Sequence, residues 1–205
     1  MFGVIALCLV GYVAGSVPWG LLIAKFFCGI DPRTAGSMST GATNVSRLCG
    51  FGYGVATLAC DLGKGALPVW IAVQSDFSVF AVSAVAFLCV LGHVFSCFMH
   101  FHGGKAVATT IGVFLPIAFF PLLGSAALCL LLIYLSGFVS LGSLTLVSSL
   151  PLFLAYSGTY DWIPLSLLLA ALVFYKHREN IARLHRGEEK PWLKSRQNND
   201  KKECE

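Results

Sequence analysis

The sequence predicts an all-α integral membrane protein with seven transmembrane helices, its N-terminus outside and its C-terminus in the cytoplasm. Two observations lead to this prediction. Of the 205 residues, 57% are hydrophobic and 12% are charged, whereas soluble domains carry about 25% charged residues. Lys and Arg are also unevenly distributed, because residues 176–202 hold nine of the fourteen. The composition therefore indicates a polytopic membrane protein with a basic C-terminal tail.

A helix that crosses the hydrocarbon core needs roughly 20 apolar residues. Apolar segments of about this size lie near 2–27, 53–73, 77–100, 105–120, 121–138, 142–157 and 161–178. The first could be mistaken for a signal peptide, but no Lys or Arg precedes it, so we predict an uncleaved span. Residues 111–135 are interrupted only by glycines and prolines and fit one kinked helix or two short ones. We take two, which makes seven spans.

The positions of Lys and Arg give the predicted orientation. The loop 28–52 carries two arginines, the loop near 100–105 carries Lys105, and the tail after 176 carries nine basic residues. The connections near 74–77, 116–121 and 157–161 carry none. Under the positive-inside bias, the basic loops and the tail face the cytoplasm, which requires an odd number of spans. We expect residues 1–190 to form one membrane domain and residues 191–205 a polar, disordered tail.

The eight cysteines are scattered among apolar neighbours, with no CxxC pair and no Cys/His spacing typical of metal sites. We expect them to serve as small hydrophobic side chains. No disulfide framework and no metal site are expected.

Residues 31–47 combine Arg33 and Arg47 with several hydroxyl side chains, Asn44 and two glycines. Most of these groups donate hydrogen bonds, and glycine lets backbone N–H groups turn toward an anion. A loop of this composition beside a bilayer indicates anion binding, with phosphate as the leading candidate.

Gly103-Gly104-Lys105 opens the next predicted span and could form a second anion cradle from free N–H groups, a helix N-terminus and an ammonium group. Its spacing is not that of a nucleotide-binding P-loop. Asp61 and Lys64 are three residues apart on one helix face and can pair, which fits a structural pair that supports the site. Lys25 fits a snorkelling anchor at the end of the first span.

His177 and Asn180 close the last span and share one helix face, where both could bind a polyol. The chain has no HxxxxD motif and no cluster of acids for metals. Many cations and hydroxyls with few carboxylates suit anion stabilisation and the positioning of reactants. This inventory favours transfer from a donor that is already activated.

Together these motifs resemble the bacterial acyl-phosphate:glycerol-3-phosphate acyltransferases, the PlsY family, over nearly the full chain. The resemblance rests on four ordered motifs, in which the matching residues are Ser16-Val17-Pro18 through Lys25 with Gly29, Asp31, Arg33, Gly36-Ser37, Gly41-Ala42-Thr43-Asn44 and Arg47; Asp61, Lys64 and Gly65; Gly92-His93, Phe95, Phe98, Phe101, Gly103-Gly104-Lys105 and Val107-Ala108-Thr109; and His177 through Leu184 with Gly187 and Glu189.

The resemblance implies a cytoplasm-facing membrane enzyme that moves a fatty acyl group from acyl phosphate to the 1-hydroxyl of glycerol 3-phosphate, without a cofactor. It implies a catalytic set of Arg47, Lys105, His177 and Asn180. The implied glycerol-3-phosphate ligands are Ser37, Thr43, Asn44, Arg47, Lys105, His177 and Asn180. The implied acyl-phosphate contacts are His93, Gly103, Gly104 and Ser140, with structural support from Asp61, Lys64 and Glu189. A soluble acyl-phosphate synthase is a further implied partner, and nucleic acid is not expected.

Several positions depart from the family pattern. Met38 stands at a usual glycine, Ser39 at a usual amide, Ser96 at a usual proline and Ala106 at a usual glycine. Met38 restricts the backbone of the first loop, whereas we expect Ala106 to matter little because it would already be helical. The general base stays open between His177 and the leaving phosphate, with the phosphate favoured. A transporter for a phosphorylated metabolite is the main alternative function, although no repeat or pair of broken helices is visible.

Overall fold

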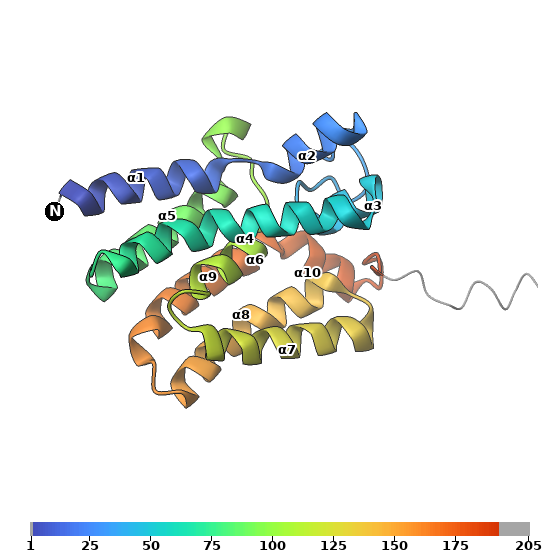
Figure 1. Ribbon diagram of the computed structural model, residues 1–205. Helices are drawn as coiled ribbons and strands as arrows, with labels where there is room; N and C mark the ends of the chain where they lie inside the picture. The colour runs from blue at the N-terminus through green and yellow to red at the C-terminus, as the bar shows by residue number, and fades with distance from the viewer. Residues whose placement is uncertain (1, 193–205) are drawn as a thin grey trace, which may run out of the picture.

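The computed structural model describes residues 2–192, and every regular element in this range is a helix (Figure 1). The elements in chain order are α1 (Phe2–Ser16), α2 (Trp19–Cys28), α3 (Ala42–Cys49), α4 (Phe51–Gln74), α5 (Val79–Val94), η1 (Cys97–Met99), α6 (Val107–Phe114), α7 (Phe119–Ser136), α8 (Val139–Tyr156), η2 (Tyr160–Trp162), α9 (Ile163–Lys176) and α10 (Arg178–His185). The long helices run roughly side by side and form one bundle.

The segment predicted as one span over 2–27 is broken between α1 and α2. Pro18 lacks a backbone N–H and disfavours helical geometry in the residue before it, so helical hydrogen bonding stops at Ser16 and starts again from the Pro18 carbonyl. The two pieces together still form one long apolar segment, Phe2–Cys28. The break gives the first span an irregular stretch of backbone within the bundle.

Five segments are long and apolar enough to cross a membrane, by length and composition: Phe2–Cys28, Phe51–Gln74, Val79–Met99, Phe119–Ser136 and Val139–Tyr156. The predicted break within 111–135 is confirmed, because α6 ends at Phe114 and α7 begins at Phe119. The predicted span 105–120 contains the eight residues of α6, about 12 Å at 1.5 Å per residue, and the first two residues of α7. Helix α9 has 14 residues and is also short for a span.

Helix packing relies on small residues at the closest crossings. Helix α1 packs on α5, α4 on α6, and α7 on α8. At the first crossing a side-chain carbon on Gly15 would overlap the Cys89 carbonyl, and one on Gly92 would overlap the Tyr12 carbonyl. Small residues allow this close approach of helices in membranes. Many large apolar side chains point outward, among them Phe26, Phe80 and Phe120, as expected for a surface in contact with lipid.

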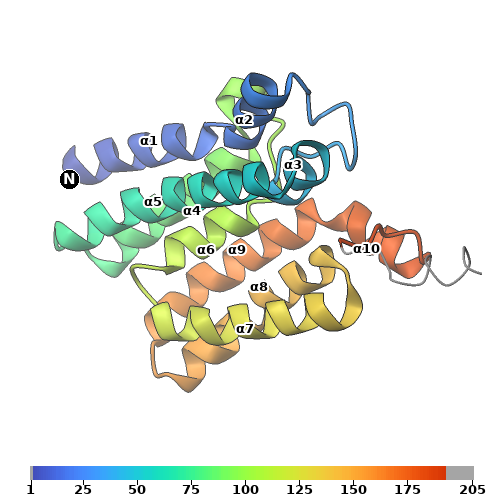
Figure 2. The same ribbon diagram turned by 45° about the vertical axis from the view of Figure 1, so that its right-hand side comes forward.

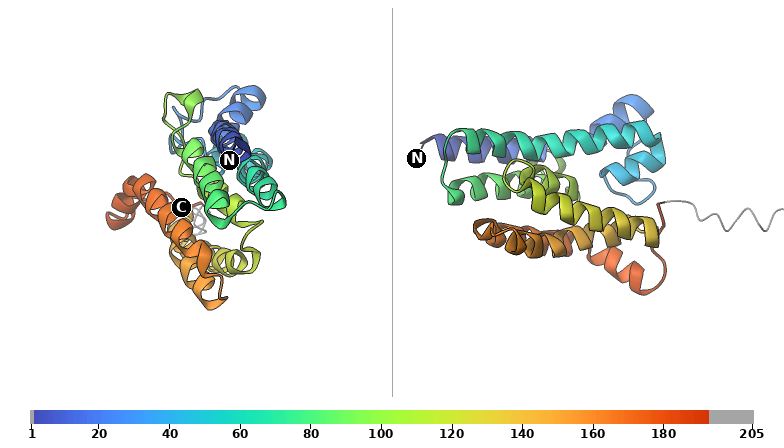
Figure 3. Two further views of the ribbon diagram at one scale, coloured as in Figure 1. Left: turned by 90° about the vertical axis from the view of Figure 1, so that its left-hand side faces the viewer. Right: turned by 60° about the horizontal axis from the view of Figure 1, so that its bottom comes forward.

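The polar segments gather at the end of the bundle away from the N-terminus. The α2–α3 loop, the α7–α8 turn and α10 all lie at this end in Figures 1, 2 and 3. Hydrogen bonds join them: Trp192 N–H donates to the Gly137 carbonyl at 2.8 Å, and Arg47 Nη2 donates to the Lys190 carbonyl at 3.1 Å. Segments from the start, middle and end of the chain therefore meet at one face.

The prediction that the cysteines form no disulfide is wrong for one pair. Cys28 and Cys49 are joined by a disulfide across 21 residues, with their Cα atoms 5.9 Å apart. Cys28 ends α2 and Cys49 ends α3, so the fold brings together two positions whose spacing carries no signal in the sequence. Five other cysteines in the described range are free, namely Cys8, Cys60, Cys89, Cys97 and Cys129.

The structure describes Pro191 and Trp192, the first two residues of the predicted tail. Trp192 is held by its backbone hydrogen bond to Gly137, and the Pro191 ring lies beside the same glycine. The remainder of the predicted tail, 193–205, lies outside the described residues.

Candidate active site

The first predicted anion loop, residues 31–47, covers most of an irregular segment over 29–41 and the start of α3, and it is organised around the side chain of Asn44. Its amide nitrogen donates to the carbonyls of Pro32, Ala35 and Ser39 at 2.8–3.1 Å, and its amide oxygen accepts from the Ser37 N–H at 2.8 Å. The side chain is buried. Asn44 therefore holds the loop together from within, and its hydrogen-bonding capacity is used by the protein itself.

An ion-pair cluster fixes the start of this loop. Asp31 accepts from Arg33 at 2.6 Å and lies 3.4 Å from the Lys25 ammonium. The hydrogen bond from Arg33 is the largest cause that holds the pKa of Asp31 well below its usual range, and the charges of Arg33 and Lys25 add to it. Lys25 thus pairs with Asp31 as well as marking the end of α2, and Asp31 neutralises part of the loop's positive charge.

Two of the family departures lie in the left-handed region of backbone conformation. Met38 has φ +51° and Ala106 has φ +61°, a region that non-glycine residues rarely adopt. The expectation that Ala106 is already helical is therefore wrong: it is the left-handed residue before α6, and regular helix begins at Val107. The Met38 side chain points outward and is 71% exposed, so the strain at that position is in the backbone.

The other two departures take part in the loop structure. Ser96 is buried and its hydroxyl donates to the Ser16 carbonyl at 2.5 Å, which ties the start of the 95–106 loop to the break after α1. Ser39 accepts from the Gly41 N–H through its hydroxyl at 3.2 Å. Ser39 thus forms a local hydrogen bond, whereas Ser96 forms one between distant parts of the chain.

The second predicted cradle packs tightly against His93. The N–H groups of Gly103 and Gly104 donate to the carbonyls of Val94 and His93 at 2.9 and 3.1 Å. A side-chain carbon on Gly103 would overlap the His93 carbonyl, and one on Gly104 would overlap the His93 ring. These two N–H groups are thus occupied. The N–H groups of Lys105 and Ala106 donate to no group within residues 2–192.

Behind this loop lies a buried polar cluster that includes the predicted pair of Asp61 and Lys64. Lys64 Nζ lies 2.8 Å from Asp61 Oδ1 and donates to the Val17 carbonyl at 2.9 Å. His93 Nδ1 lies 3.1 Å from the Thr109 hydroxyl and 3.8 Å from Asp61 Oδ1. The pair lines a small polar cavity bordered by the α1–α2 break and Gly104. This arrangement is consistent with the expected supporting role.

Lys105 lies in a second cluster, formed with the C-terminal part of the chain. Its Nζ donates to Asn180 Oδ1 at 2.5 Å, and the amide nitrogen of Asn180 donates to Glu189 at 2.6 Å. Glu189 also accepts from the Ser140 hydroxyl at 2.8 Å and from Arg183 at 2.7 Å. Three helices, α8, α10 and the start of α6, are thereby linked through one carboxylate.

Burial lowers the pKa of Lys105 to about 8, and the nearby Glu189 carboxylate opposes this shift while Arg183 and Arg47 add to it. For Glu189, burial alone would raise the pKa. Hydrogen bonds from Asn180, Arg183 and Ser140 reverse this, so that the pKa is lowered overall. The cluster therefore holds an ionised Glu189 carboxylate near Lys105, whose ammonium group loses its proton at a lower pH than that of an ordinary lysine.

The remaining predicted residues border this cluster or the first loop. His177 is buried, and its Nδ1 lies 2.8 Å from the Val173 carbonyl. Because a carbonyl can only accept, Nδ1 carries the proton and Nε2 is left for another partner. Arg47 is exposed and directed at the Lys190 and Pro191 carbonyls. Ser37 and Thr43 lie half-buried in the first loop and its helix.

The described contacts link Lys105, Asn180, Glu189, Ser140 and Arg183 directly, and they place Arg47 against the segment that carries Glu189. The resemblance implies only a supporting role for Glu189, so its central position is a finding of the structure. The sequence signal for it is weak, because Glu189 is one of several acids in a basic C-terminal segment. Chemically, the face offers cationic and hydroxyl groups with one carboxylate that orients them, which suits binding of phosphate groups.

Comparisons with known proteins found similar sequences and similar solved structures. The family model described as glycerol-3-phosphate acyltransferase matches residues 5–187. A glycerol-3-phosphate acyltransferase of Desulfovibrio desulfuricans is 66% identical over 185 residues, covering 90% of this chain and 83% of the relative. Crystal structures of PlsY, an integral membrane glycerol 3-phosphate acyltransferase, are similar in the glycerol 3-phosphate form (TM-score 0.88) and in the lysophosphatidic acid form (0.86). Each is 37% identical and covers 92% of this chain and 95% of the crystallised chain.

Proposed function

This chain belongs to the glycerol-3-phosphate acyltransferase family and is a multi-pass integral membrane enzyme that produces lysophosphatidic acid, and we propose that acyl phosphate is its donor and the 1-hydroxyl of glycerol 3-phosphate its acceptor. The observation that carries the proposal is the Lys105–Asn180–Glu189 cluster, which holds an ammonium group at the 103–106 loop. Both proposed substrates carry phosphate, and both loops present cationic groups. Because the chain belongs to an acyltransferase family, the alternative of a transporter for a phosphorylated metabolite is dropped.

The proposed seat of glycerol 3-phosphate lies between the two loops. Lys105, Arg47, Ser37 and Thr43 would hold its phosphate, and His177 would contact its glycerol part through Nε2. In this proposal Asn44 and Asn180 do not bind the substrate directly, because their side-chain amides already form hydrogen bonds within the protein. Asn44 shapes the loop that carries Ser37, and Asn180 orients the ammonium of Lys105.

Acyl phosphate would be placed by the 103–106 loop. We assign the direct contact to the N–H groups of Lys105 and Ala106, since those of Gly103 and Gly104 donate to Val94 and His93. His93 would then brace the loop from behind, and Ser140 would act through Glu189. Asp61 and Lys64 would keep the α1–α2 break in place beneath it.

In the proposed reaction the 1-hydroxyl oxygen of glycerol 3-phosphate attacks the acyl carbonyl carbon, and the bond from that carbon to the phosphate oxygen breaks. The leaving phosphate takes the hydroxyl proton. A mixed anhydride is activated enough to need no covalent enzyme intermediate, so positioning and anion stabilisation suffice. His177 remains the other candidate base. Near-normal turnover of His177→Gln with weaker glycerol 3-phosphate binding would exclude it as an obligatory base.

The proposed membrane arrangement has seven spans, with α6 and α9 as the two short ones, the N-terminus outside and the site facing the cytoplasm of a bacterial cell membrane. It is supported by the α2–α3 loop and α10, both of which carry arginines and lie at the end of the bundle opposite the N-terminus in Figure 1. A cytoplasmic site would be open to a soluble acyl-phosphate synthase. Residues 1–190 would act as one domain.

One assay tests the proposed function. The purified full chain is given acyl phosphate and glycerol 3-phosphate in metal-free buffer, and release of phosphate and formation of lysophosphatidic acid are followed together. We expect equal amounts of both products. Activity only with acyl-coenzyme A, or only after a divalent metal is added, would overturn the donor assignment.

A further inference from the structure

We propose that the Cys28–Cys49 disulfide is a reversible modification site, reduced by a dithiol, that controls how tightly the enzyme binds glycerol 3-phosphate. The proposal rests on the proposed function for its effect on binding. The disulfide itself is independent of that function and lies outside the residues assigned to the reaction.

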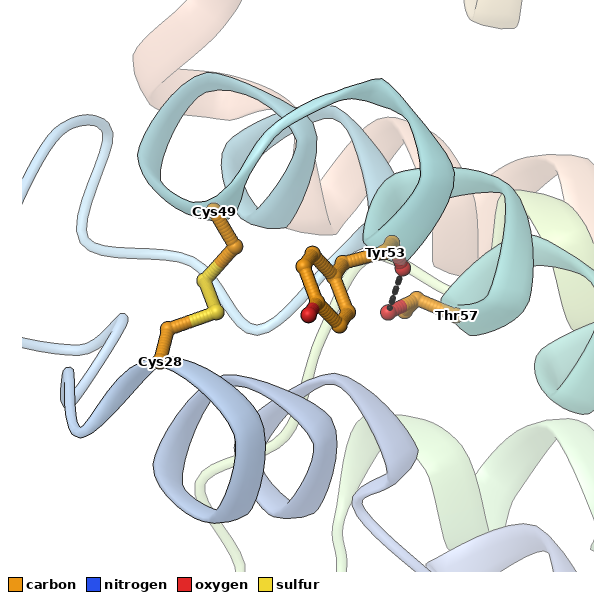
Figure 4. The surroundings of a disulfide bond; sticks show 4 residues. All are labelled: Cys28, Cys49, Tyr53 and Thr57. Atoms are coloured by element: carbon orange, nitrogen blue, oxygen red, sulfur yellow. Dashed lines mark hydrogen bonds between the residues drawn. A yellow bond between two sulfur atoms is a disulfide. The ribbon is translucent and has the colours of Figure 1, made fainter.

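The disulfide closes the loop that carries the proposed phosphate ligands. Figure 4 shows it bridging the end of α2 and the end of α3, beside Tyr53 of α4. The 20 residues between Cys28 and Cys49 include Ser37, Thr43 and Arg47. Both cysteines are partly exposed, so a reductant can reach them. Within residues 2–192 the structure has no other disulfide.

Without the disulfide, α3 would be held by its non-covalent packing on α2 and α4. It has eight residues, and its N-cap, Gly41, provides no side-chain hydrogen bond. Isolated helices of this length are marginal in water. Arg47 is two residues before Cys49, and its guanidinium reaches the Lys190 carbonyl. Releasing Cys49 therefore loosens the end of the helix that places Arg47.

Other contacts would preserve the fold after reduction. Asn44 still gathers the loop through four backbone groups, and Ser46 of α3 rests against Gly54 of α4. The ring of Phe27 also lies 5.8 Å from that of Tyr53, which keeps the end of α2 near α4. Reduction should thus alter the precision of the phosphate seat and leave the bundle intact.

The proposed orientation gives the disulfide its regulatory character. Loop 29–41 lies at the end of the bundle that we assign to the cytoplasm, where dithiols keep most cysteines reduced and disulfides are usually transient or redox-sensing. The exchange is balanced: one thiolate of the dithiol attacks a sulfur of the disulfide, and its second thiol resolves the mixed disulfide. The products are the Cys28 and Cys49 thiols and the oxidised dithiol, after transfer of two electrons and two protons.

The test uses the full chain in membranes equilibrated with mixtures of reduced and oxidised dithiothreitol. After an acid quench, alkylation and peptide mapping report the state of Cys28 and Cys49, and initial rates give KM for glycerol 3-phosphate in the same samples. We expect the disulfide to open and close with the buffer. We also expect KM to be at least about threefold higher in the reduced state, with kcat little changed, since a misplaced binding group weakens its contact.

Variants separate the disulfide from other thiols. Cys28→Ser and Cys49→Ser should each show the high KM in every buffer, and either one suffices if the other fails to fold. Cys97→Ser is the matched control, because Cys97 is exposed and free, and it should respond like the unchanged chain. Full alkylation of Cys28 and Cys49 under oxidising conditions would overturn the disulfide. If KM were the same with the disulfide oxidised and reduced, the proposed control of binding would be overturned. Loss of acyl transfer in both states would contradict the proposed function instead.

Discussion

Lys105 and Asn180 are joined by a hydrogen bond of 2.5 Å although 75 residues separate them in the chain. The ammonium of Lys105 is thereby turned toward α10 and the Glu189 carboxylate. The hydrogen bond fixes the position of the one lysine in the 95–106 loop, whereas burial and the nearby charges, Glu189 first among them, determine its pKa.

Lys105 should limit activity at alkaline pH. Its pKa is lowered to about 8, so below this value it is protonated and can hold a phosphate, and above it the charge is lost. We expect kcat/KM for glycerol 3-phosphate to fall by about tenfold for each pH unit above that pKa. Lys105→Arg keeps its charge across this range, so its profile should stay flat from pH 8 to 10. An alkaline limb that persists in Lys105→Arg would assign it to another group.

Glu189 should act as a positioning residue. In Glu189→Gln the carboxylate that accepts from Ser140, Asn180 and Arg183 is replaced by an amide, and one of its two acceptors becomes a donor facing Arg183. A lost hydrogen bond to a charged group costs about 1.5–3 kcal/mol, so we expect kcat/KM to fall by roughly 10- to 100-fold. Steady-state kinetics with both substrates measure this.

The pH profile distinguishes this role from a merely structural one. Because the Glu189 carboxylate raises the pKa of Lys105 against the effect of burial, Glu189→Gln should move the alkaline limb to lower pH. Glu188→Gln is the matched control: Glu188 pairs with Arg186 at the surface, and such exposed pairs contribute little. Equal effects of the two substitutions would contradict the positioning role.

Asn44 should affect one substrate more than the other. Asn44→Ala removes the partner of the Ser37 N–H and of three loop carbonyls, and each buried group left unpaired costs about 1–3 kcal/mol. We expect KM for glycerol 3-phosphate to rise by about tenfold or more, and KM for acyl phosphate to change much less. Thr34→Ala, an exposed residue in the same loop, should leave both unchanged. A uniform loss for both substrates would indicate general unfolding instead.

Much of the fold followed from the sequence because apolar length and basic residues are local signals. The break at Pro18 and the short length of α6 were not predicted from the sequence, because both depend on how the neighbouring loops pack against the helices. The site residues stay a prediction, and the structure adds how their side chains are paired. The sequence predicts Asn44 and Asn180 as substrate ligands, whereas in the structure their side-chain amides form hydrogen bonds with other parts of the protein. Such pairings depend on contacts across the whole chain, as does the Cys28–Cys49 disulfide.

The two left-handed residues that replace usual glycines should cost stability. Met38 and Ala106 have φ of +51° and +61°, where a non-glycine residue is disfavoured by about 1–2 kcal/mol. Glycine avoids this strain but loses more entropy on folding, by roughly 0.5–1 kcal/mol. Met38→Gly and Ala106→Gly should therefore each raise the free energy of unfolding by up to about 1 kcal/mol, seen as a higher Tm in detergent. Ala108→Gly is the opposite control: Ala108 lies inside α6, so the same change should lower Tm by removing a helix former. If Ala106→Gly and Ala108→Gly shifted Tm in the same direction, backbone strain at Ala106 would not be the cause.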